Sequence, residues 1–166
     1  MDTDGFLDEI DRQWPQPGEP PSKQLVDLCL RAVREHPESS ALWYDLGTIM
    51  QRCGDEYYYT RADYLRCYEN AVKCDVGNWE AYQELAYVLD TYFDDYVAAE
   101  RAFRAAIKVG AEAESYCGLA RVLAQVGKTD DAINILSEGV CPFHSDSEVQ
   151  KMRAEIVAGD WSMRPG

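Results

Sequence analysis

The chain has 166 residues, of which 46% are hydrophobic, and this is enough to form the core of one ordinary domain or one short repeat array. Its 30 acidic and 16 basic residues give a formal charge of −14, which would repel nucleic-acid phosphates and attract basic partners. No segment offers the roughly 18 uncharged apolar residues that a membrane span needs, and the acidic N-terminus differs from a secretory signal. The composition therefore predicts a soluble, cytoplasmic protein with neither a nucleic-acid nor a membrane partner.

Residues 1–21 form an acidic segment that ends in a proline-rich run, PQPGEPP. Its apolar residues Phe6, Leu7, Ile10 and Trp14 are typical of a short helix, and the prolines predict a semi-rigid tether after it. Such a helix can fold back against the apolar side of residues 25–33 or remain free. Our prediction is that it folds back.

From residue 22 onward, apolar residues recur every three or four positions, as they do along one side of an α-helix. Two helical patterns alternate. The first begins at Trp43 (WYDLGTIM), Tyr82 (YQELAYVL) and Tyr116 (YCGLARVL), and the second at Tyr64 (YLRCYENAV), Ala99 (AERAFRAAI) and Ala132 (AINILSEGV). A further copy of the second pattern, LVDLCLRAV at 25–33, has no first pattern before it, so the array is expected to open with half a unit.

Tyr82 and Tyr116 are 34 residues apart. Three features together resemble the tetratricopeptide repeat over about residues 23–146: this period, the aromatic-x2-Leu-Gly/Ala first helix and the Ala-x3-Phe/Tyr/Leu-x2-Ala second helix. Small residues such as Gly47 and Gly139 are expected to let the paired helices approach closely.

The resemblance implies an all-α fold, a right-handed α-α superhelix of antiparallel helix pairs. It implies a repeat domain at 22–160 after the segment 1–21, composed of a half-repeat at 22–37, repeats at about 40–78, 79–112 and 113–146, and a capping helix at 147–158. A tail at 161–166 follows, in which Trp161 is expected to close the end of the array.

The first repeat is longer than the others. Trp43 and Tyr82 are 39 residues apart, five more than the period, and the extra residues lie within GDEYYYTRADY at 54–64. Insertions into repeat arrays often bind partners, and tyrosine is enriched at interfaces. Tyr57, Tyr58 and Tyr59 therefore form a possible second binding surface, unless they only pack against one another and against Tyr68.

The resemblance also implies that the first helices line a concave groove for a peptide or helix of a partner. The groove positions it implies are Tyr44, Asp45, Thr48, Arg52, Glu80, Gln83, Glu84, Tyr87, Asp90, Glu114 and Arg121. Repeats that hold the C-terminal carboxylates of chaperones carry Lys and Asn at matching positions, whereas this chain has residues such as Tyr44, Gln83 and Arg121. The acidic side chains instead predict a basic or amphipathic partner segment, unless they serve only solubility.

Residue types that would carry chemistry are sparse in the sequence. The six cysteines form no CxxC pair, the two histidines have no evident nucleophile beside them, and no glycine-rich phosphate motif occurs. We therefore expect no catalytic residue, no cofactor and no metal site.

The sequence thus predicts a non-catalytic protein-binding module. A small acidic chaperone for secreted or translocated proteins is one alternative, and an enzyme or an enzyme-associated regulatory subunit is another. The sequence pattern defines no oligomeric state.

Overall fold

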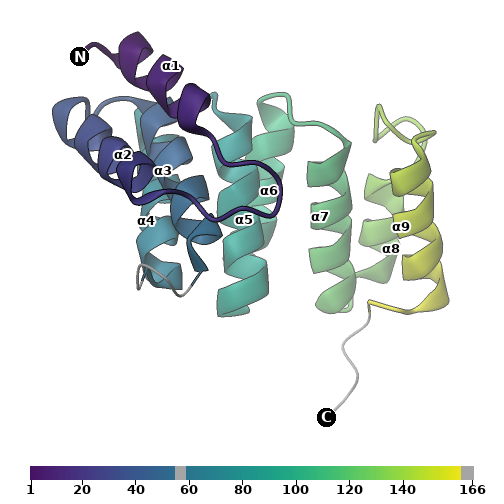
Figure 1. The fold of residues 1–166 in the computed structure, drawn as a ribbon. Coiled ribbons are helices and arrows are strands. Elements are labelled where there is room, and N and C mark those ends of the chain that lie inside the picture. The colour runs from purple at the N-terminus through teal and green to yellow at the C-terminus, as the bar shows by residue number, and fades with distance from the viewer. Residues whose placement is uncertain (55–58, 162–166) are drawn as a thin grey trace. The chain divides into compact units, whose positions relative to one another are not determined.

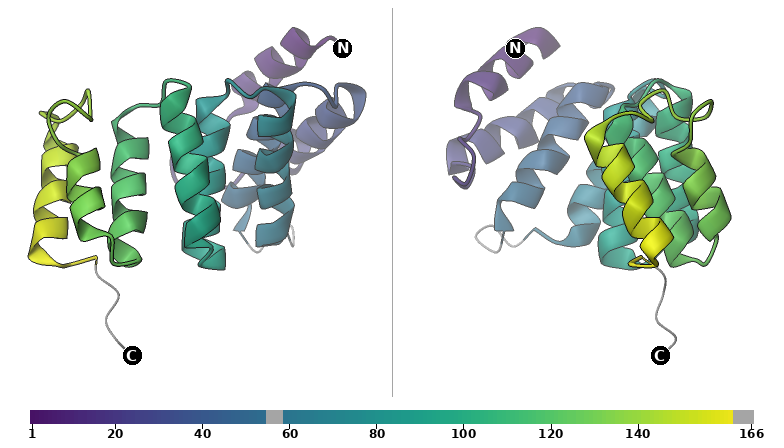
Figure 2. Two further views of the ribbon diagram at one scale, coloured as in Figure 1. Left: turned by 180° about the vertical axis from the view of Figure 1, so that it is seen from behind. Right: turned by 90° about the vertical axis from the view of Figure 1, so that its right-hand side faces the viewer.

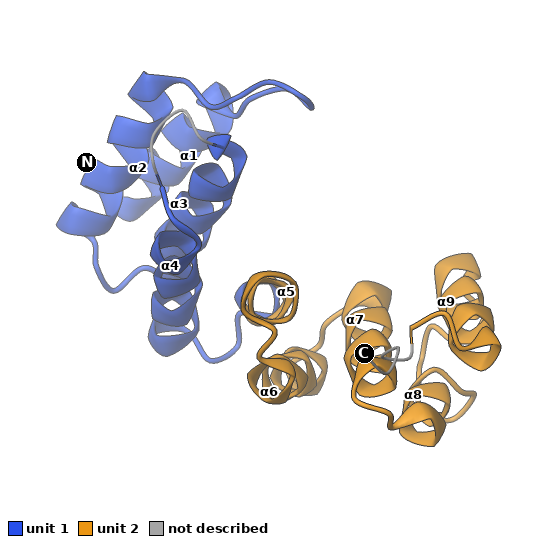
Figure 3. Cartoon of the chain, turned by 90° about the horizontal axis from the view of Figure 1, so that it is seen from below, with its two compact units in different colours: residues 1–81 blue, residues 82–166 orange. Residues whose placement is uncertain are grey.

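The computed structural model describes residues 1–54 and 59–161, and within these ranges it contains α-helices and no strands (Figure 1). The helices are α1 (Thr3–Gln13), α2 (Lys23–Glu35), α3 (Ser40–Arg52), α4 (Arg61–Cys74), α5 (Trp79–Phe93), α6 (Tyr96–Lys108), α7 (Ala113–Gln125), α8 (Thr129–Ile135) and α9 (Ser147–Ala158). None of these helices is long and apolar enough to cross a membrane. The chain divides into two units, Met1–Ala81 and Tyr82–Gly166 (Figure 3).

The α3–α4 pair is the centre of unit 1. Gly47 on α3 faces Tyr68 on α4, whose side chain is fully buried. A Cβ atom on Gly47 would lie 2.8 Å from Tyr68 Cε1, so the close approach of the two helices depends on glycine. The Tyr68 hydroxyl donates to Gln51 Oε1 at 2.8 Å, which satisfies its only donor inside the pair. The predicted packing role of Gly47 is confirmed.

The N-terminal helix α1 packs against α2, as Figures 1 and 2 show from three directions. Phe6 and Ile10 have no exposed surface, and the Phe6 ring meets the His36 ring edge-on at 5.7 Å between centroids. The prediction that this segment folds back is confirmed. Because the Met1 carbonyl lies 2.7 Å from His36 Nε2, the start of α1 meets the end of α2, so the two helices are antiparallel. Helices α1 and α2 thus form a pair ahead of α3, and the boundaries of the half-repeat at 22–37 stay a prediction.

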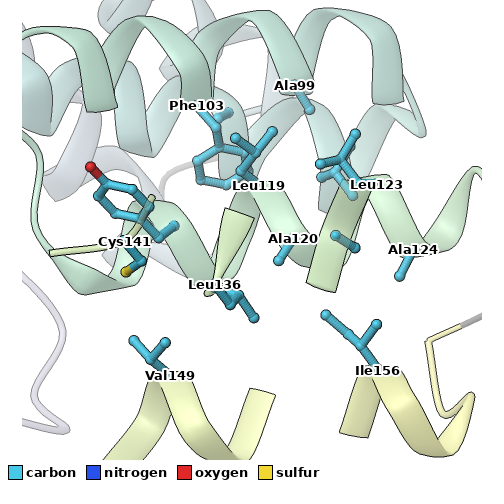
Figure 4. Close-up of a cluster of buried hydrophobic side chains, with 14 of the residues drawn as sticks. Ala99, Phe103, Leu119, Ala120, Leu123, Ala124, Leu136, Cys141, Val149 and Ile156 are labelled. Carbon is cyan, nitrogen blue, oxygen red and sulfur yellow. The ribbon is translucent and has the colours of Figure 1, made fainter. Parts of the chain in front are cut away.

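Unit 2 has its core between α6, α7 and α9 (Figure 4). Phe103 and Leu119 are fully buried between α6 and α7, and Val149 and Ile156 point from α9 toward α7. Helix α9 lies at the residues predicted for the capping helix, and it contacts both α7 and α8. Trp161 packs against the same core, and its role in closing the array stays a prediction.

The last repeat departs from the sequence-based expectation. The pattern AINILSEGV predicts a helix up to residue 140, but α8 ends at Ile135. The Ser137 hydroxyl donates to the Asn134 carbonyl at 2.6 Å and so competes with the helical ladder. Gly139 is exposed and has a φ of 87°, a left-handed conformation that favours glycine. Its predicted role in helix packing was therefore wrong.

Candidate functional site

Three carboxylates from successive first helices gather in unit 1. Asp45 on α3 is half-buried, and burial together with the nearby carboxylates of Asp11 on α1 and Glu80 on α5 raises the pKa of Asp45 to about 7. We call Asp11, Asp45 and Glu80 the unit 1 acidic face. Sequence reasoning missed Asp11. The signal was its position next to Ile10, one of the apolar residues by which α1 packs against unit 1.

The other predicted groove residues of unit 1 make contacts within the unit. The Thr48 hydroxyl donates to the Tyr44 carbonyl at 3.1 Å and lies 3.4 Å from the Tyr68 hydroxyl. The centroids of the Tyr44 and Tyr68 rings are 6.0 Å apart. Tyr44 and Thr48 therefore lie along the contact between α3 and α4. Arg52 Nη2 donates to the Gln16 carbonyl at 3.1 Å, which fastens the proline-rich tether to the end of α3.

Asp45→Asn is expected to stabilise unit 1 by about 2 kcal/mol at pH 8 and by little at pH 4. The folded-state pKa of Asp45, about 7, lies above the value near 4 of an unfolded chain. Its contribution to stability is therefore complete below about pH 4 and is lost as the pH rises to 7. Asparagine has no charge to bury, so the variant avoids this loss.

Urea unfolding at pH 4, 6 and 8 measures the effect of Asp45→Asn. The matched control is Asp27→Asn, because the Asp27 carboxylate is exposed and pairs with Lys23 Nζ at 2.5 Å. A stability difference between Asp45→Asn and the unaltered protein that is the same at all three pH values would contradict the prediction.

Two further carboxylates meet in unit 2. Burial, and then the charge of Glu114 on α7, raises the pKa of Glu84 on α5. Gln83 is only 7% exposed; its Nε2 donates to Glu114 Oε2 at 3.3 Å and its Oε1 accepts from Ser115 Oγ at 2.6 Å. Gln83 thus ties α5 to α7 and holds Glu114 beside Glu84. We call Glu84 and Glu114 the unit 2 acidic pair.

Arg121 does not neutralise the unit 2 acidic pair, because its guanidinium is bound elsewhere. Its Nε and Nη2 donate to Asp90 Oδ2 at 3.1 and 2.5 Å, and it lies 5.2 Å from the centroid of the Tyr87 ring and 5.7 Å from that of Trp161. Tyr87 also donates from its hydroxyl to the Glu114 carbonyl at 3.3 Å. The predicted groove residues of unit 2 are therefore linked to one another, and their net charge is negative.

The tyrosine insertion falls partly outside the described residues. Tyr57 and Tyr58 lie outside them, whereas Tyr59 is half-buried and burial raises the pKa of its phenol. The second binding surface stays a prediction.

No family model matches the sequence, and no curated protein matches it either. Solved structures do resemble it. YrrB, described as a TPR protein with an unusual peptide-binding site, is 18% identical with a TM-score of 0.65, and the match covers 81% of this chain and 67% of YrrB. A MamA protein is 20% identical with a TM-score of 0.67, over 95% of this chain and 87% of that one.

A third structure, TTC0263 from Thermus thermophilus, is described as a thermophilic TPR protein and gives the same result. It is 11% identical with a TM-score of 0.61, over 95% of this chain and 88% of TTC0263. At these identities the likeness concerns the fold, and it agrees with the repeat pattern of the sequence. The chain therefore has the fold of the tetratricopeptide-repeat (TPR) proteins.

Proposed function

We propose that the chain is a non-catalytic protein-binding module whose first helices take up a basic or amphipathic segment of a partner protein. The observation that carries this proposal is the crowding of carboxylates on the first helices. The raised pKa values of Asp45 and Glu84 mean that ionising these groups costs free energy in the unbound protein. Burial is the larger cause of that cost and neighbouring carboxylates the smaller, and a Lys or Arg of a partner would offset part of it.

Two further observations support the proposal. The formal charge of −14 attracts basic segments over a distance and speeds their encounter, and it repels nucleic acids. YrrB, which has a similar fold, is described as having a peptide-binding site. A peptide or a helix is therefore the class of ligand that the acidic side chains of this fold would take.

An amphipathic peptide of about 18 residues with lysines on its polar side is expected to bind the protein at least about tenfold more tightly than the same peptide with glutamates. The affinity, measured by isothermal titration calorimetry, is expected to fall as salt is added, because salt screens the attraction. Equal binding of the two peptides would contradict the proposal.

Substitutions identify the face that the peptide uses. Glu84→Gln with Glu114→Gln removes the unit 2 acidic pair, and Asp45→Asn with Glu80→Gln removes most of the unit 1 acidic face. Either double variant is expected to weaken binding about three- to tenfold if its face is used. The control is Asp131→Asn with Glu138→Gln, which changes the net charge equally at exposed positions on α8 and in the turn after it. A loss as large in the control would mean that net charge alone determines binding.

A further inference from the structure

Two buried side chains form the centre of the contact between α1 and unit 1. Phe6 and Ile10 are its buried residues, and an open hollow of about 590 Å³ runs along the contact between α1 and α2, beside Glu9, Gln13, Leu28 and Arg31. A second open hollow, of about 510 Å³, lies between Arg52 and the tether at Pro17, Gly18, Glu19 and Pro20. Helix α1 buries two apolar side chains, and contacts of Met1 and Arg31 also join it to α2, but open hollows flank both the helix and its tether.

Charge is unfavourable at one point of the docked α1. The helix and its cap carry five acidic residues and one basic residue: Asp2, Asp4, Asp8, Glu9, Asp11 and Arg12. Docking places Asp11 near Asp45, whose ionisation the charges of Asp11 and Glu80 oppose. The place that α1 occupies is thus apolar at Phe6 and Ile10 and unfavourable for a carboxylate at Asp11, whereas Arg31 and Arg34 of α2 lie on the Glu9 side.

We propose that α1 is an exchangeable occupant of unit 1, and that a basic amphipathic helix of the partner replaces it. The incoming helix would place two apolar residues, four positions apart, where Phe6 and Ile10 lie, and a Lys or Arg where Asp11 lies. This inference rests on the proposed function, and it adds the location of the site, the form of the partner and an internal competitor.

The contacts of Phe6 specify the first of the two apolar residues. The ring of Phe6 lies edge-on to His36, and the Arg31 guanidinium lies 5.3 Å from the ring centroid. An aromatic ring satisfies both neighbours, whereas an aliphatic side chain would lose the cation–π contact with Arg31. The partner helix therefore carries an aromatic residue and, four positions later, an aliphatic one.

The test uses a synthetic peptide that copies residues 1–14 with Asp4→Lys, Asp8→Lys and Asp11→Lys and keeps Phe6 and Ile10. Its matched control is the same peptide with both apolar residues changed to alanine. The tether keeps α1 at a high local concentration, so the protein's own helix competes with the added peptide. Hydrogen exchange of residues 6–10 in the unaltered protein is expected to speed up when the peptide is added, because α1 is then displaced.

Two variants of the full chain change this competition in opposite directions. Phe6→Ala with Ile10→Ala releases α1, and the peptide is then expected to bind at least about tenfold more tightly than it binds the unaltered protein. Asp11→Lys lets α1 pair with Asp45 and Glu80, and the peptide is then expected to bind about three- to tenfold more weakly. The control peptide is expected to bind neither variant.

Three results would overturn the inference. The first is equal affinity of the peptide for the unaltered protein and for the variant with α1 released. The second applies if circular dichroism shows that the variant with α1 released is unfolded. The Asp11→Lys variant keeps the buried residues, and an unchanged or higher affinity of the peptide for that variant would then contradict the inference. The third is binding of the 18-residue lysine peptide but not of the α1-derived one, which would leave the proposed function intact. Binding of neither lysine peptide would instead overturn the proposed function as well.

Discussion

Replacing Gly118 with alanine is expected to destabilise unit 2 by about 2 kcal/mol, although alanine is the better helix former by about 1 kcal/mol. Gly118 lies within α7, and a Cβ atom there would overlap Cζ and Cε1 of the Phe103 ring. Phe103 is fully buried, and its ring also packs edge-on against Tyr87 at 5.1 Å between centroids. The ring therefore cannot move aside without opening the core, and the overlap outweighs the gain in helix propensity.

Urea unfolding of the Gly118→Ala variant measures this effect. Cys117→Ala is the control, because it alters the adjacent, half-buried position of the same helix without adding atoms. Adding Phe103→Leu to Gly118→Ala is expected to recover part of the loss, since the shorter side chain leaves room for the new methyl group. A Gly118→Ala protein as stable as the unaltered one would show that α6 and α7 are farther apart than described.

Arg121→Met is expected to cost unit 2 about 3 kcal/mol, because it leaves a buried carboxylate without its cation. The Asp90 side chain is 4% exposed and that of Arg121 20%. Asp90 Oδ1 has no hydrogen-bond partner among the described residues, and Asp90 Oδ2 accepts from Arg121. Without Arg121, neither oxygen would keep a hydrogen bond that the structure shows. The substitution also removes the contacts of the guanidinium with the Tyr87 and Trp161 rings.

A double variant separates the ion pair from the packing of the long side chains. Asp90→Leu with Arg121→Met is expected to be close to the unaltered protein in free energy of unfolding, because replacing both members of a buried pair by apolar residues is often neutral. Arg104→Ala is the surface control: Arg104 is 49% exposed and pairs with Glu100 one turn away, so its loss is expected to cost less than about 1 kcal/mol. Equal losses for Arg121→Met and Arg104→Ala would contradict the account.

Much of the fold could be predicted because each helix pair carries its packing partners in nearby sequence. Gly47 and Tyr68 belong to the two patterns of one repeat, and their contact follows from the register of those patterns. The sequence could suggest that α1 packs against α2, but not that the two form an antiparallel pair. Helix α1 lacks the aromatic-x2-Leu pattern, and an irregular tether connects it to α2. The early end of α8 depends on a side-chain hydrogen bond of Ser137, to which hydrophobic periodicity is insensitive.

The candidate site was predictable at the level of helix sides but not of individual partners. Helical spacing placed Asp45 and Glu84 on first helices, where the structure has them. That Gln83 is buried and bonded to Ser115, and that Asp11 approaches Asp45, depend on contacts between helices that are distant in sequence. Such contacts follow from tertiary packing, which the sequence pattern of one helix does not contain.

The capping helix α9 affects the tendency of the protein to self-associate at high concentration. Val149 and Ile156 point from α9 toward α7, while Lys151 and Arg153 are exposed to solvent. Without α9, the apolar sides of α7 and α8 would be open to the matching surface of another molecule, and such a head-to-tail contact repeats without closing. By covering these sides with a charged outer surface, α9 would lower the tendency of unit 2 to associate through them.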